Sequence, residues 1–107
     1  MKTISVAKDF SCFPSGRWKV NGEASGQGLR EILLEPELRA GNEIMVDLDG
    51  TMGFSSAFLE EAFGGIVRSL DIEPERLLNL LHFKSDDDPS LVEEVIEYIL
   101  DAAKKPA

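Results

Sequence analysis

The sequence predicts one small α/β domain in which helices pack on a mixed sheet of about four strands. Short runs of apolar and β-branched residues alternate along the chain with longer segments of helical periodicity. Each helical segment carries its apolar residues on one side only, so it must pack against a sheet to bury them. The 107 residues, 43% of them hydrophobic, suffice for one core, and we expect a single domain over residues 1–107.

Four segments are predicted to be strands. Residues 4–7 open the chain, and residues 17–20 follow a Pro-Ser-Gly turn and are expected to return as an edge strand. Residues 44–48 are apolar at nearly every position, which is typical of a central strand covered on both faces. Residues 80–83 form the last predicted strand.

Two helices are predicted in the first two thirds of the chain, each beginning at a serine. Ser25 is a good N-cap for the first helix, which Pro36 is expected to break or restart. From Ser55 the apolar residues take the spacing of an amphipathic helix that ends at Leu70. Two glycines at positions 64 and 65 lie inside that helix, and we expect a close neighbouring backbone to compensate for their cost.

Two further helical segments are predicted toward the C-terminus. A single short helical turn is expected near Pro74. Asp88 should cap the final helix and Pro89 should begin it. Lys104 and Lys105 close that helix, where positive charge is favourable to the helix dipole.

The charge of the chain indicates which partners it avoids. Eleven Lys and Arg against 20 Asp and Glu give a formal net charge of −9, so nucleic-acid phosphates and anionic membranes should repel the protein. No apolar run approaches the roughly 20 residues of a membrane-spanning helix, and the N-terminus lacks the pattern of a secretory signal. Cys12 is the only cysteine, which fits a reducing compartment. We therefore expect a cytoplasmic protein without nucleic-acid or membrane partners.

Two stretches of the sequence are similar to a known family. The letters MVDLDG at residues 45–50 and FSSAFLEEAFGG at residues 54–65 resemble a STAS-like bacterial family of unknown function. The resemblance extends to Phe10, Pro14 to Arg17, Ser25-Gly26, Arg30-Glu31, Pro36, Leu38 and residues 85–91. It implies a small STAS-like α/β fold. It implies no mechanism, because that family has no assigned activity.

More distantly, the layout is similar to anti-sigma-factor antagonists. In those proteins a partner kinase phosphorylates a serine where a buried strand leads into a helix, and the phosphate breaks a protein complex. Ser55 and Ser56 occupy that place here, although Phe54 and Ala57 stand where those proteins have Asp and Gly. The resemblance implies a protein partner of the ATPase-like or kinase-like regulator class. The alternative for the two serines is simple capping of the helix start.

A second interpretation is enzymatic. The letters DLDGT at residues 47–51 match the first motif of Mg²⁺-dependent haloacid dehalogenase-type phosphatases, in which Asp47 would attack phosphorus and Asp47 with Asp49 would hold the metal. Lys84 and the acidic run Asp86 to Asp88 could serve as later parts of such a site. Residues 52–107 contain only one further predicted strand, too few for the remaining motifs of that enzyme core.

A third interpretation is a small-ligand or nucleotide-binding module, with the start of the helix near Ser55 as its natural site. The preferred interpretation is a non-catalytic, regulatory protein-interaction module without cofactor or metal, and its oligomeric state is left open. Arg17 and Arg30 are expected on solvated faces, with carboxylate pairing as the alternative. The candidate binding or switch residues are Asp49, Ser55, Ser56, Glu60, Glu61 and Arg17.

Overall fold

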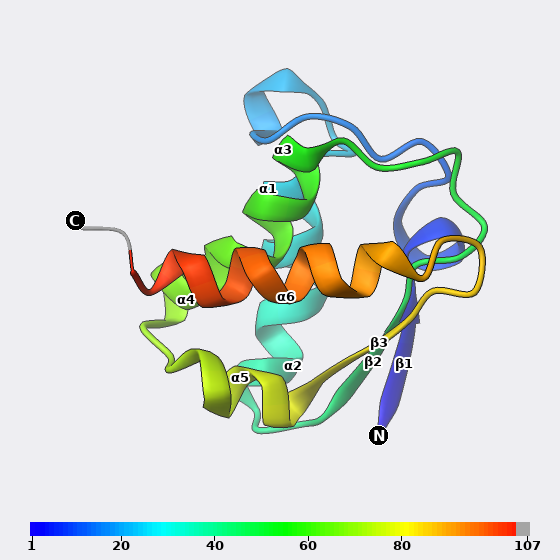
Figure 1. The fold of residues 1–107 in the computed structure, drawn as a ribbon. Coiled ribbons are helices and arrows are strands. Elements are labelled where there is room, and N and C mark those ends of the chain that lie inside the picture. The colour runs from blue at the N-terminus through cyan, green and yellow to red at the C-terminus, as the bar shows by residue number, and fades with distance from the viewer. Residues whose placement is uncertain (105–107) are drawn as a thin grey trace.

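The helices of the domain gather on one side of a three-stranded sheet (Figure 1). The computed structural model describes residues 1–104. Its strands are β1 (Lys2–Ser5), β2 (Ile44–Asp47) and β3 (Leu81–Lys84). They are parallel throughout and lie in the order β1-β2-β3. The α/β class and the single domain are confirmed, whereas the prediction of a mixed sheet of about four strands is wrong.

The predicted edge strand at residues 17–20 is the one that does not form. The chain makes instead a single 3-10 turn, η2 (Lys19–Asn21), closed by the N–H of Asn21 on the carbonyl of Trp18 at 2.9 Å. Trp18 and Val20 remain 47% and 88% exposed. A strand at this place would have no neighbouring strand to pair with and no apolar face to cover. The alternation of charged and apolar side chains over four residues therefore does not lead to a strand.

The two faces of the sheet differ in burial. Ile4, Val46 and Phe83 are register partners on the face that carries the core, and Ile4 and Val46 are almost fully buried. On the opposite face Thr3 is exposed, while Met45 and His82 are only half-buried. The central position of β2 is confirmed, but the prediction that both its faces are covered is wrong. The helices labelled in Figure 1, α1 to α6, lie on the side of the sheet that carries the core.

A long helix follows the η2 turn and runs through Pro36 without breaking. Its segments are α1 (Gly26–Leu29), η3 (Arg30–Leu34) and α2 (Glu35–Arg39). Ser25 caps it as predicted, because its hydroxyl accepts a 3.0 Å bond from the N–H of Gly28. Proline has no N–H and crowds the preceding turn. The helix widens into a π turn just before Pro36, where the N–H of Glu35 reaches back to the carbonyl of Arg30. The predicted break is therefore a bulge.

The second long helix has the same construction. Its segments are α3 (Ser56–Leu59), η4 (Glu60–Gly64) and α4 (Gly65–Leu70). Ser55 caps it through a 3.1 Å bond from the N–H of Phe58, as predicted. A π turn in its middle is closed by the N–H of Gly65 on the carbonyl of Glu60. The helix ends at Leu70, and Asp71 then takes a left-handed conformation with φ of 51°.

The remaining elements lie near their predicted positions. Strand β1 ends at Ser5, and the next residues form the π turn η1 (Val6–Phe10) rather than extending the strand. Helix α5 (Pro74–Leu80) is longer than the single turn expected. Helix α6 (Ser90–Ala102) follows Asp88, whose carboxylate accepts a 3.2 Å bond from the N–H of Ser90. Lys104 lies beyond its end, and Lys105 is outside the described residues.

The two long helices cross at Gly26. A β-carbon there would overlap the carbonyl oxygen of Phe58 and come within 3.1 Å of the nitrogen of Ala62. Gly64 similarly faces a neighbouring backbone, since a β-carbon there would lie 3.1 Å from the carbonyl oxygen of Tyr98. The compensation predicted for Gly64 is thus present. Within residues 1–104, no helix has the length and apolar character needed to cross a membrane.

Candidate functional site

The predicted site residues fall in two separate places. Asp49 and Ser55 lie on the loop that follows β2 and Ser56 begins α3, while Glu60 and Glu61 lie in the π turn of the second long helix and are 8% and 3% exposed. The carboxyl ends of strands in an open α/β sheet are the usual place for binding sites. The strand-end loops are therefore the first candidate for a binding surface.

Asp49 ties together the two loops that leave β2 and β3. Its carboxylate accepts bonds from the Lys84 ammonium at 2.8 Å, from the N–H of Asp87 at 2.8 Å and from the N–H of Asp86 at 3.1 Å. The bond from Lys84 first, and then those from the two N–H groups, lower the pKa of Asp49 to about 2. Asp49 is therefore ionised at neutral pH and acts as a clamp.

Asp47 and Lys84 complete this cluster. They are register partners at the ends of β2 and β3, and a carboxylate oxygen of Asp47 accepts a 2.9 Å bond from the N–H of Asp49. Lys84 also lies 3.0 Å from the carboxylate of Asp86, and its bonds to Asp49 first and Asp86 second raise its pKa. The structure thus brings together two residues of the phosphatase-like motif, Asp47 and Asp49, and places the Lys84 ammonium against Asp49.

Exposed apolar side chains stand beside this clamp. Phe13 is 69% exposed and Met52 is 76% exposed. The N–H of Met52 donates a 2.8 Å bond to the carbonyl of Cys12, which joins the two loops, and the N–H of Gly50 donates to the carboxylate of Asp87 at 3.0 Å. We call the surface formed by residues 12–13 and 49–56 the loop face. The sequence interpretation did not single out Phe13 or Met52, although both are large apolar residues set among turn residues.

Ser55 and Ser56 are exposed at the edge of the loop face. The Ser55 oxygen accepts the bond from Phe58 that caps the helix. Capping is therefore its structural role. The next residue, Ser56, already belongs to the first turn of α3.

Glu60 and Glu61 enter an ionic network that links three parts of the fold. Arg17, from the loop before η2, donates to Glu60 and lies 3.6 Å from Glu61. Arg68, from α4, donates to both oxygens of Glu60 at 2.7 and 3.0 Å. Burial raises the pKa of Glu60, but the hydrogen bonds from Arg68 and Arg17 outweigh burial and hold the pKa below its ordinary value. Glu60 is therefore a buried anion at neutral pH.

Arg30 lies at the inner end of the network. It is 7% exposed, and its two terminal nitrogens donate to Glu35 at 2.6 Å and to Glu61 at 3.0 Å. The expectation of a solvated Arg30 is wrong, because the π turns bring it against both carboxylates. Gly65 makes room for it, since a β-carbon there would lie 2.8 Å from Nε of Arg30. The network holds the two long helices together, and its charges are paired inward.

Comparison with protein families supports the resemblance read from the sequence. The model of a STAS-like domain of unknown function (DUF4325) matches residues 25–91. The matched range begins at the Ser25 cap and ends in the first turn of α6, so it contains β2, β3, the Asp49 clamp and both long helices. Searches of curated proteins and of solved structures gave no match.

Proposed function

The chain belongs to the family of STAS-like domains of unknown function, and from that premise we propose that it is a non-catalytic module that binds another protein through the loop face. The proposed binding surface ends at Ser56, because Glu60 and Glu61 are buried too deeply to touch a partner. Arg17, whose side chain is 34% exposed, bonds to Glu60 and belongs to the interior network rather than to the loop face.

The exposure of Phe13 and Met52 is the observation that carries the proposal. Exposing large apolar side chains to water is unfavourable in free energy, and burying them against a partner removes that penalty. Aromatic and Met side chains are also enriched where proteins bind each other. The loops that carry them are joined by the Met52–Cys12 bond and anchored by Asp49. Binding therefore needs little additional ordering of the loop backbone, which lowers its entropic cost.

The charge beside the loop face indicates what kind of partner fits. Asp86 and Asp87 follow the clamp and are exposed, and Asp9 is exposed in the η1 turn that precedes Cys12. The chain as a whole carries a net charge of −9. A partner surface with an apolar centre and a basic rim would be complementary. A kinase-like or ATPase-like regulator with such a surface is the partner class that we propose.

The test uses the full chain as bait and compares matched substitutions. Phe13→Ser and Met52→Ser should each weaken the captured partner's affinity about tenfold or more, as expected for central apolar contacts. Leu100→Ser, which also replaces a partly exposed apolar residue but on α6, should leave the affinity unchanged. Binding should also weaken as salt is raised, because screening acts on the basic rim. Equal affinities for all three variants would contradict the proposal.

Regulation through the helix start is part of this proposal. Ser55→Asp and Ser56→Asp each place a negative charge on the loop face, and a charge that must be desolvated in an apolar interface weakens binding. Aspartate is itself a good N-cap, so Ser55→Asp should keep the fold. We expect both variants to bind more weakly with unchanged thermal unfolding. Unchanged partner affinity of both variants would contradict regulation at the helix start. The proposal that a partner binds the loop face would then still be tested by Met52→Ser.

A Mg²⁺-dependent phosphatase is the second candidate, favoured by the meeting of Asp47, Asp49 and Lys84 at one edge of the sheet. Two backbone N–H groups and the Lys84 ammonium already occupy the Asp49 carboxylate, so a metal would have to displace part of the clamp. Release of phosphate from p-nitrophenyl phosphate with Mg²⁺, abolished by Asp47→Asn, would favour the enzyme over the binding module.

A further inference from the structure

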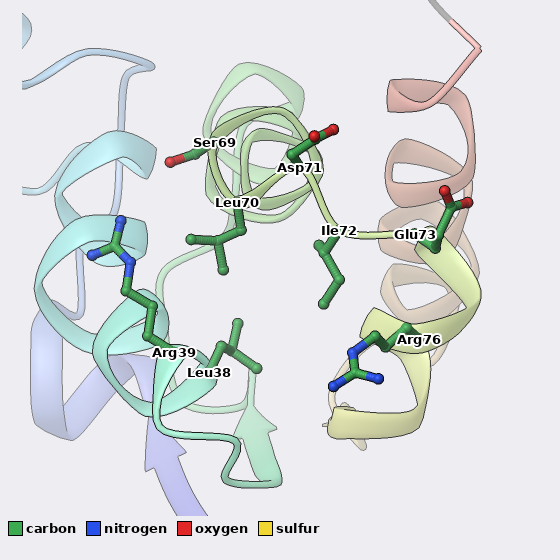
Figure 2. Close-up of a pocket in the computed structure, with 8 residues that line it drawn as sticks. All are labelled: Leu38, Arg39, Ser69, Leu70, Asp71, Ile72, Glu73 and Arg76. Atoms are coloured by element: carbon green, nitrogen blue, oxygen red, sulfur yellow. The ribbon is translucent and has the colours of Figure 1, made fainter.

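A hollow of about 640 Å³ lies between α2, the end of α4 and the start of α5 (Figure 2). This volume is within the range of roughly 300–1,000 Å³ that small-molecule pockets occupy. None of the residues that line the hollow belongs to the loop face, so any ligand here is separate from the proposed partner surface.

The middle of the hollow is apolar. Leu38 from α2, Leu70 from the end of α4 and Ile72 from the following loop turn their side chains toward the same gap (Figure 2). Leu38 is 6% exposed, and the other two are half-buried. Three aliphatic side chains from three segments thus face a space that the chain itself does not fill. An aliphatic group placed there would gain roughly 0.8 kcal/mol per buried methylene before the costs of binding.

The walls of the hollow carry two guanidinium groups. Arg39 and Arg76 stand on opposite sides of the gap, while the carboxylates of Asp71 and Glu73 point away from it (Figure 2). Arg39 already donates a 3.2 Å bond to Glu35. Arg76 makes no ion pair or side-chain hydrogen bond with any part of the chain that the structure describes, residues 1–104. One cationic group is therefore available at the wall of an apolar gap.

We propose that this hollow binds a small aliphatic carboxylic acid, with its hydrocarbon chain between Leu38, Leu70 and Ile72 and its carboxylate paired with Arg76. A planar guanidinium pairs with a carboxylate through two parallel N–H bonds, which also fixes the direction of the ligand. A single negative charge matches one uncommitted guanidinium, whereas a doubly charged phosphate would need Arg39 to leave Glu35.

The test compares three eight-carbon probes that differ only in the head group. Octanoate, octanol and octylamine are titrated below their aggregation concentrations into the full chain, and the methyl NMR signals of Leu38, Leu70 and Ile72 are followed. Octanoate should shift these signals saturably and raise the unfolding temperature. Octanol should bind about tenfold more weakly, and octylamine more weakly still, because Arg76 attracts one head group and repels the other.

Substitutions at residues that line the hollow separate the contribution of charge from the contribution of apolar burial. Arg76→Ala should reduce octanoate affinity to that of octanol, and Arg76→Lys should restore part of it. Ile72→Ser should weaken octanoate and octanol alike, whereas the matched removal of an exposed cation elsewhere, Lys8→Ala, should change neither. The proposal is overturned if octylamine binds as well as octanoate, if Arg76→Ala leaves octanoate affinity unchanged, or if the methyl signals do not saturate. None of these outcomes bears on capture of a protein by the loop face.

Discussion

Arg30 leaves water almost completely when the chain folds, since only 7% of it stays exposed. Desolvating a guanidinium is costly, and the cost is offset only if opposite charges and good hydrogen bonds await it inside. Glu35 and Glu61 supply both, at 2.6 and 3.0 Å. Removing one partner from such an arrangement leaves an uncompensated buried charge, which costs more than the pair contributes.

Arg30→Leu should therefore destabilise the domain by about 3–5 kcal/mol, because Glu35 and Glu61 would stay buried with fewer hydrogen-bond donors around them. Arg39→Leu is the matched control: its side chain is 62% exposed, and Glu35 keeps its bond to Arg30 when Arg39 is replaced, so it should cost less than about 1 kcal/mol. Urea unfolding of both variants measures the difference. Similar losses for the two variants would show that the buried network contributes little.

The Asp49 clamp gives a pH dependence with a definite sign. The folded pKa of about 2 lies below the ordinary value of 3.8, so the clamp stabilises the fold above about pH 4 and loses this contribution as the pH falls toward 2. The stability difference between the wild type and Asp49→Asn should shrink over that interval. Asp101→Asn, on the exposed side of α6, removes one carboxylate without touching the clamp and serves as the control. Urea unfolding at stepped pH values checks both.

Local contacts could be predicted from the sequence and distant ones could not. The caps at Ser25 and Ser55 depend on residues three positions away, so spacing alone finds them. The partners of Arg30 include Glu61, 31 positions along the chain, and only the packing of two helices brings them together. A charged residue on the polar side of a helical pattern gives no sign that another helix will cover it.

The crossing of the two long helices depends on the absence of a side chain at Gly26. A β-carbon would overlap the Phe58 carbonyl, which belongs to helix backbone and cannot move without shifting the helix. Gly26→Ala should therefore destabilise the domain by about 2 kcal/mol or more, against the slight gain in helix propensity. Ser69→Ala, on the exposed part of α4, should stay within about 0.5 kcal/mol. Equal unfolding midpoints would mean that the helices adjust freely.

Periodicity identified the helices better than it identified the strands. The amphipathic stripe from Ser55 to Leu70 extends over four turns, so one π turn does not hide it. Residues 17–20 offered only two alternations, and that pattern is equally compatible with a loop whose apolar residues stay exposed. Pro36 was expected to break its helix because proline removes one hydrogen bond. The π turn before it shifts the bonding pattern and lets the helix continue.

The functional surfaces combine segments that the sequence keeps apart, which limits what could be predicted about them. The strand end at Asp49 and the helix start at Ser55 were recognisable from their motifs. The Phe13 loop is bonded to Met52 through the Cys12 carbonyl, and the hollow needs Leu38 and Arg76 from two different helices. The order of the parallel strands determines which segments become neighbours in space. The sequence pattern of a four-residue strand is too short to reveal that order.

The net charge of −9 sets two electrostatic effects against each other. Salt weakens the exposed ion pairs, such as Lys2–Glu37, but it also screens the repulsion among the excess carboxylates. The buried pairs of Arg30 are screened least. Exposed pairs contribute little each, so relief of repulsion should dominate, and the urea midpoint should rise between about 20 and 200 mM NaCl. Glu97→Lys reverses one exposed charge and should flatten this rise. A midpoint that falls with salt would mean that the surface pairs stabilise the fold more than the excess charge opposes it.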